Sequence, residues 1–224
     1  MSGSSTSPRV GECREVLFWL LLLGSWQLLA SPGSKTGIIG AVGVAAFLVH
    51  AWANVDRLRG LGLDHACWRS AARTNWVLAA VSGILAGIIV FVIGTVSGQN
   101  MRLGDNWKLI ALQATLGPVL EEIMFRGYLF AFLMWLLSKA TNDVGLGPLI
   151  VVFAAVVFAV VHLAQPGVSW LQLACITATG TLYGWIRWRS GSTAPAAVSH
   201  AVYNLALYAI SGAVLLGEKA LPSR

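Results

Sequence analysis

Long runs of apolar residues separated by short polar segments dominate the chain. The runs span residues 16–30, 37–53, 76–97, 107–137, 146–163, 168–185 and 194–216. Most approach or exceed the length that a helix needs to cross a bilayer, about 20 residues. The run at 107–137 is too long for one upright helix and contains Gly117-Pro118, and a proline kinks a helix or begins a new one. The pattern predicts an all-α fold, a polytopic membrane helical bundle with seven or eight transmembrane helices.

Polar segments at both ends limit this predicted bundle. We expect a polar N-terminal tail at 1–15, a single transmembrane domain at 16–216 and a C-terminal tail at 217–224. The first apolar run is short, as in a signal peptide, but no net positive charge precedes it and more runs follow, so we expect a retained helix. With 107–137 counted as one crossing, nine Lys and Arg lie on the amino-terminal side and five on the other. This asymmetry predicts a cytoplasmic amino terminus.

The composition agrees with burial in lipid. The chain is 57% hydrophobic and only 11% charged, whereas an average soluble domain carries about 25% charged residues. The net charge of +6 comes from Lys and Arg in short loops, without a basic stripe, so it does not indicate nucleic acid as a partner. The three cysteines, Cys13, Cys67 and Cys175, are widely spaced and show neither a disulfide framework nor a zinc-binding pattern.

Two glutamates and an arginine lie deep inside an apolar run. A charged residue at the centre of a membrane helix costs roughly 2.5–3.5 kcal/mol, so Glu121, Glu122 and Arg126 are candidates for function. Glu122 and Arg126 are four residues apart and share one helical face, which predicts an ion pair. Glu121 is turned about 100° away and has no cation on its own face, so it is the glutamate free to do chemistry. The alternative is that all three form one structural salt bridge.

Two histidines within apolar runs also follow helical spacing. Phe158 is four residues before His162, and His200 is four residues before Asn204. An imidazole and a carboxamide on one helical face supply donors aimed at a common point. His50 has no polar partner nearby in sequence and His65 lies in a charged loop, so we assign neither of them to a site.

These residues fall into three motifs that resemble a known family. EEIMFRG at 121–127 resembles the EExxxR motif of the CAAX-protease and bacteriocin-processing (CPBP) family, which is related to the Ras-converting CAAX endopeptidases. FAVVH at 158–162 is similar to its FxxxH motif, and HAVYN at 200–204 to its HxxxN motif. The order and spacing agree, and the resemblance covers about 107–216.

The resemblance implies a glutamic-type intramembrane endopeptidase with no metal or other cofactor. Its substrate would be a membrane-anchored protein or peptide. By position in the motifs, Glu121 with His162 would activate a water, and His200 with Asn204 would stabilise the oxyanion. Glu122, Arg126 and Phe158 would support the site.

Three other functions stay open at the level of sequence. A zinc-dependent membrane protease is the nearest, because two His and a Glu can hold zinc, although no HExxH pair occurs. A bacteriocin-immunity-like binding protein and a proton-coupled transporter are the others.

One geometric expectation tests the assembled site. If helices begin level at Pro148 and Pro195, His162 lies about 21 Å along its helix and His200 about 7–8 Å, so one helix must tilt, break or enter lower.

Overall fold

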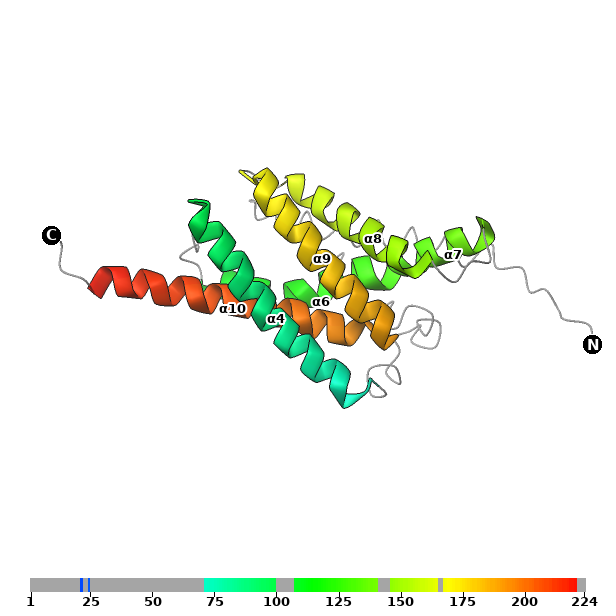
Figure 1. Cartoon of the computed structure of the whole chain (residues 1–224), viewed down its shortest axis with the longest axis horizontal. Helices are drawn as coiled ribbons and strands as arrows, with labels where there is room; N and C mark the ends of the chain where they lie inside the picture. Colours follow the sequence, from blue (N-terminus) through cyan, green and yellow to red (C-terminus); the bar gives the residue numbers. More distant parts are fainter. Residues whose placement is uncertain are drawn as a thin grey trace, which may run out of the picture.

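The computed structural model describes residues 21, 24, 71–99, 107–140, 146–164 and 167–220. Every regular element among them is helical, so the all-α prediction is confirmed for this part of the chain. Figure 1 shows the long helix nearest the C-terminus crossing other long helices obliquely. In order the elements are α4 (Arg73–Val96), α5 (Trp107–Ala114), α6 (Leu116–Glu122), the π-helix η2 (Ile123–Leu129), α7 (Phe130–Ala140), α8 (Gly147–Val161), the 3₁₀ turn η4 (His162–Ala164), α9 (Trp170–Ser190) and α10 (Thr193–Ala220).

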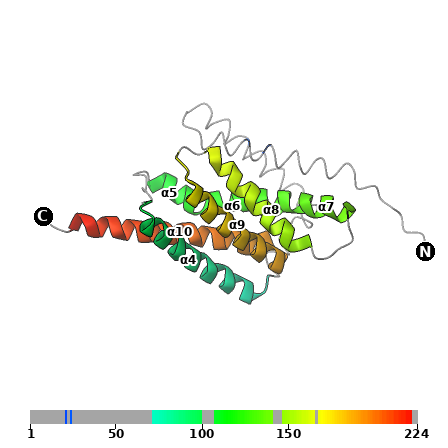
Figure 2. The ribbon, with the colours of Figure 1, turned by 45° about the horizontal axis from the view of Figure 1, so that its top comes forward.

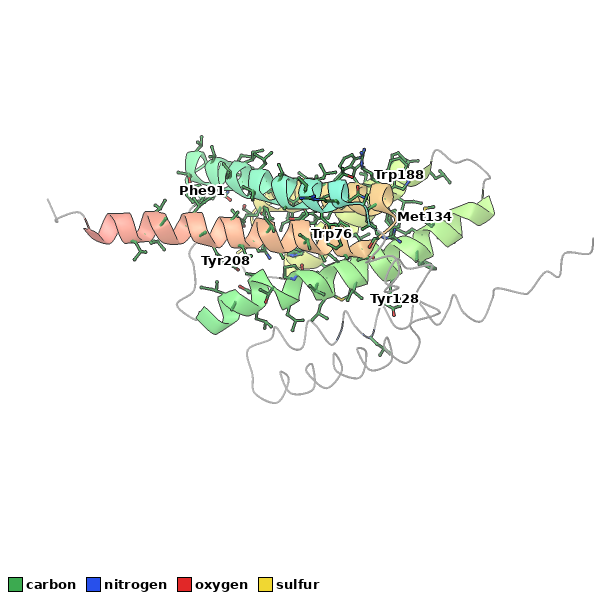
Figure 3. The ribbon with its side chains drawn as sticks, turned by 90° about the horizontal axis from the view of Figure 1, so that it is seen from below. Trp76, Phe91, Tyr128, Met134, Trp188 and Tyr208 are labelled. Atoms are coloured by element: carbon green, nitrogen blue, oxygen red, sulfur yellow. The ribbon has the colours of Figure 1, made fainter. Side chains whose placement is uncertain are left out.

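Two of the described helices are long and apolar enough to cross a membrane, and they lie at Arg73–Val96 and Thr193–Gly217. Gly147–Val161 is a shorter apolar helix. The outer face of α4 exposes large aliphatic side chains, including Val81, Leu85 and Ile89, as expected of a surface against lipid (Figure 3). The predicted runs at 16–30 and 37–53 lie outside the described residues, so the count of seven or eight spans stays a prediction.

Small residues bring α4 and α10 into close contact. A side chain at Gly83 would meet the backbone carbonyl of Ser199, and one at Gly87 would come within 2.8 Å of the Ala206 Cβ. The hydroxyls of Ser82 and Ser199 lie 3.2 Å apart across the same contact. This is the small-residue packing of membrane helices, where close backbone approach replaces the hydrophobic effect as the source of attraction.

A second pair of glycines packs α9 against α8 (Figure 2). A Cβ at Gly184 would meet Val151 at 3.1 Å, and one at Gly180 would meet Ala155 at 3.3 Å. The hydrophobic core lies beside this pair and includes Leu120, Met124, Tyr128, Ile150 and Phe158. The core therefore joins α6 and η2 to α8, and this contact brings two of the three sequence motifs together.

The long run at 107–137 is interrupted, as its length and Pro118 predicted. Thr115 leaves helical geometry with φ −125° and ψ −77°, and α6 then begins at Leu116 with Pro118 in its first turn. A proline is tolerated in that position because the first N–H groups of a helix have no partner within the helix. A second irregularity follows at η2, and π-helical turns are frequent at functional sites.

Candidate active site

The two motif glutamates occupy the last two positions of α6, directly before the π-helix. Glu122 and Arg126 are both fully buried, and the Arg126 Nη1 donates to the Glu122 Oε1 at 2.9 Å. The ion pair expected from their spacing is thus present. The Glu121 side chain keeps 18% of its surface exposed and makes no contact with Arg126 among the described residues. The two adjacent carboxylates therefore lie in different surroundings.

Arg126 is enclosed by α8 and α9. Its Nη2 donates to the Gly180 carbonyl at 2.6 Å, and its guanidinium carbon lies 4.6 Å from the centre of the Phe158 ring. A Cβ at Gly180 would come within 3.0 Å of that Nη2. Gly180 is therefore the position where α9 makes room for the guanidinium. The guanidinium also lies over the Tyr183 ring at 5.5 Å.

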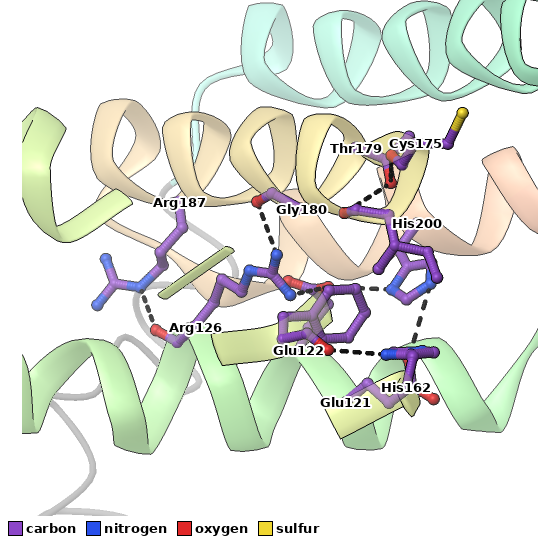
Figure 4. Close-up of polar contacts among 11 residues, drawn as sticks. Glu121, Glu122, Arg126, His162, Cys175, Thr179, Gly180, Arg187 and His200 are labelled. Carbon is purple, nitrogen blue, oxygen red and sulfur yellow. Dashed lines mark hydrogen bonds and ion pairs between the residues drawn. The ribbon is translucent and has the colours of Figure 1, made fainter. Parts of the chain in front are cut away.

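His200 contacts both motif glutamates (Figure 4). Its Nδ1 lies 3.0 Å from the Glu122 Oε1, and its Nε2 lies 3.8 Å from the Glu121 Oε2. Because an ionised carboxylate only accepts hydrogen bonds, the Nδ1 carries the proton in the Glu122 contact. The Tyr183 ring stacks on the imidazole with centroids 4.6 Å apart and an angle of 17°. Glu122 and Tyr183 together fix the ring so that its Nε2 faces Glu121.

His162 lies where α8 tightens into the 3₁₀ turn. Its Nδ1 is 2.7 Å from the Phe158 carbonyl, which can only accept, so this nitrogen carries a proton and the contact leaves the Nε2 unused. The Phe158 ring contacts the His162 ring at 4.7 Å and the His200 ring at 5.9 Å. One aromatic ring thus contacts both motif histidines.

The contact between Phe158 and His200 accounts for the different depths that the sequence predicts for His162 and His200 along their helices. His200 lies beside the Phe158 turn of α8, although it is much closer to the start of its own helix. Figure 1 shows why, since α10 crosses α9 obliquely and does not run parallel to it. The expectation that one helix must tilt or enter at another level is thereby met.

Asn204 is engaged with the end of α5. Its Nδ2 donates to the Gln113 backbone carbonyl at 2.8 Å, and the Tyr208 hydroxyl donates to the Gln113 Oε1 at 2.8 Å. The Asn204 amide has two N–H groups, and this contact uses one of them. An oxyanion role for Asn204 must therefore use its second N–H group.

Several residues around the motifs were not found from the sequence, namely Gln113, Gly180, Tyr183, Arg187 and Tyr208. Arg187 was counted among the loop cations, and this was wrong. It is a buried residue in the last turn of α9, and its Nε donates to the Arg126 carbonyl at 3.2 Å. The spacing of Gly180 and Gly184 was the available sequence signal for a close helix contact on α9.

Carboxylate and imidazole atoms of the kind that zinc binds do meet here, from Glu121, Glu122 and His200. Within the described ranges, however, no three His, Cys, Asp or Glu side chains are grouped closely enough to hold a metal ion. Cys175 is a half-buried free thiol on α9.

Comparison with protein families gives one match. Residues 104–206 match the family model described as type II CAAX prenyl endopeptidase Rce1-like. The matched segment runs into α10 and contains all three sequence motifs. No curated protein and no solved structure matched the chain.

Proposed function

We propose, from the match of residues 104–206 to the Rce1-like family model, that the chain is a multi-pass, glutamic-type intramembrane endopeptidase of the CAAX-protease family. The family implies a membrane peptidase acting on a membrane-associated protein substrate, and the apolar helices α4 and α10 agree with an integral membrane protein. The observation that carries the proposal is the contact of one imidazole, His200, with both motif glutamates.

Glu121 is the proposed general base. Its carboxylate takes a proton from a water molecule, and the hydroxide adds to the carbonyl carbon of the scissile peptide bond. The Nε2 of His162 accepts a hydrogen bond from the same water and helps to orient it, which agrees with the Nδ1 donating to the Phe158 carbonyl. When the tetrahedral intermediate collapses, the C–N bond breaks and protonated Glu121 returns its proton to the leaving amine.

His200 and Asn204 are the proposed oxyanion donors. With its Nδ1 donating to Glu122, protonated His200 presents an Nε2–H to the negative oxygen of the intermediate. The second N–H of Asn204, one turn further along α10, is the other donor. Donors fixed in advance in a site poor in water stabilise developing charge most strongly. Glu122, Arg126 and Phe158 support this arrangement, and the proposed mechanism uses no metal or cofactor.

Substitution of adjacent glutamates tests the proposal. Glu121→Gln keeps size and hydrogen bonding but cannot take a proton, so cleavage should fall by about 10²–10⁴-fold, as for a missing general base. The measurement is cleavage of a quenched fluorescent peptide with a prenylated CAAX cysteine, by equal amounts of folded protein in liposomes. His162→Ala and His200→Ala should also lose activity.

The matched control is His50→Ala, at a histidine that lies outside the described residues and that nothing ties to the site. It should cleave at nearly the parental rate. Near-parental cleavage by Glu121→Gln would instead leave an immunity-like binding protein as the better assignment. Loss of activity in His50→Ala would show that the wrong histidines were chosen.

A further inference from the structure

An amide side chain lies exposed next to the proposed site. Gln113, in the last turn of α5, is exposed, although its helix belongs to an apolar run. A polar group exposed to hydrocarbon is costly, so such residues face a water-containing cavity or a ligand. Gln113 also accepts hydrogen bonds from both Asn204 and Tyr208.

The contacts of Gln113 fix the direction of its amide. Tyr208 donates to the Oε1, so the Nε2 and its two N–H donors point away from α10. Among the described residues, no acceptor binds that Nε2. The backbone of Gln113 is fixed as well, because its carbonyl accepts from Asn204. The result is an amide that is oriented by its oxygen and whose N–H donors have no acceptor in the part of the chain that the structure describes.

The position of this amide relative to the proposed chemistry follows from α10. His200, Asn204 and Tyr208 succeed one another at four-residue intervals on one face of that helix. Tyr208, which donates to the Gln113 amide, is therefore about 12 Å along the helix axis from His200. At the other end of this series, the His200 Nε2 lies 3.8 Å from the Glu121 Oε2. Figure 3 shows Tyr208 between α10 and the α5–α6 segment.

We propose that Gln113 is a substrate-binding residue whose Nε2–H donates to a backbone carbonyl of the substrate peptide, and that Tyr208 is the positioning residue that orients it. An extended peptide advances about 3.3 Å per residue, so the bound carbonyl belongs to a residue roughly three or four positions from the scissile bond. A backbone carbonyl occurs at that point whatever the side chains, so the contact aligns many sequences. The inference rests on the proposed endopeptidase function.

The decisive substitution is Gln113→Glu, which keeps an oxygen acceptor for Tyr208 but removes both N–H donors. Because it also adds a negative charge, Gln113→Leu, which removes the donors without a charge, must raise the Kd as well. Gln99→Glu is a matched control, because the Gln99 Oε1 also accepts from a hydroxyl, that of Ser169, at 2.6 Å and outside the site. Binding of the prenylated CAAX peptide is measured by fluorescence anisotropy with each variant in the inactive Glu121→Gln background. The loss of one neutral hydrogen bond should raise the Kd about three- to tenfold for Gln113→Glu and leave Gln99→Glu unchanged.

Kinetics in the active protein give a second measurement. Gln113→Glu should raise KM by a similar factor while kcat stays within about twofold, and Tyr208→Phe should raise KM by a smaller factor. A merely structural role would lower the melting temperature without this KM effect.

The outcomes separate the inference from the proposed function. Unchanged binding in Gln113→Glu, or no binding of the peptide by the Glu121→Gln protein, overturns the inference. Cleavage by the parent together with an unchanged KM in Gln113→Glu keeps the endopeptidase and overturns the inference. Peptide binding that depends on Gln113 without cleavage by the parent supports the inference and overturns the proposed function.

Discussion

Arg126→Ala is the substitution with the largest expected effect on folding. The guanidinium is fully buried, pairs with Glu122 at 2.9 Å and donates to the Gly180 carbonyl at 2.6 Å. Its removal leaves the Glu122 carboxylate buried, with an Oε2 that has no hydrogen-bond partner among the described residues and an Oε1 that keeps only the contact with the His200 Nδ1. Removing one partner of a buried ion pair costs about 3–5 kcal/mol, because the other charge stays buried without its counter-ion.

Thermal melting of the purified protein in detergent measures this cost. A loss of 1 kcal/mol lowers the melting temperature of a 150–250-residue protein by about 2–4 °C, so Arg126→Ala should lower it by roughly 6–20 °C. Arg189→Ala is the matched control, since Arg189 is exposed on α9 and lies over the Trp185 ring at 5.5 Å. An exposed cation–π contact contributes about 0.5–1 kcal/mol, so this control should melt within about 4 °C of the parent.

A particular result would refute the reasoning. If Arg126→Ala melts at the same temperature as Arg189→Ala, the buried pair does not stabilise the fold, and the division of labour between the two motif glutamates fails. A large drop in both variants would point to a general sensitivity of α9 and its neighbours to the loss of cations.

Two further predictions concern packing and metal. In Gly180→Ala the new Cβ meets the Arg126 Nη2 at 3.0 Å and the Phe158 Cδ1 at 3.2 Å, so the variant should be less stable by about 1–3 kcal/mol. The control is Gly212→Ala on α10, where a Cβ meets nothing within 4 Å, so this variant should melt at or slightly above the parental temperature. Equal melting temperatures of the two variants would contradict the close packing of Gly180 against Arg126. Elemental analysis of active protein should find no stoichiometric zinc, and activity should survive strong chelators. About one zinc per active chain, lost together with activity on chelation, would favour the zinc-protease alternative.

Local spacing made much of the site predictable from the sequence. Glu122 and Arg126 are four residues apart, and that separation brings side chains together in an α-helix. The segment is in fact π-helical from Ile123 onward, yet the ion pair forms, because residues four apart remain neighbours in the slightly wider turn. The interruption of the long run was likewise predictable, since Pro118 can begin a helix but not continue one. Its location at Thr115 was not.

The contacts between distant segments were not predictable, because nothing in local spacing encodes them. Glu122 was assigned only to Arg126, whereas it also accepts from His200, which lies 78 residues later. Tyr183 has no motif around it, and its stacking on His200 depends on where α9 crosses α10. Arg187 seemed to belong to a loop because it follows the apolar run, but α9 continues beyond that run and buries it.

The position of His200 gives a physical reason for the different roles that we propose for the two adjacent glutamates. Glu122 is fully buried, and its Oε1 accepts hydrogen bonds from both Arg126 and the His200 Nδ1. Its negative charge therefore stabilises these two side chains. Glu121 meets the other ring nitrogen at 3.8 Å, longer than a hydrogen bond, and keeps part of its surface exposed. A general base must be able to exchange its ion-pair partner for water, and only the loosely held carboxylate can do this without leaving a charge unpaired in the core. The same imidazole that fixes one glutamate thus leaves its neighbour available.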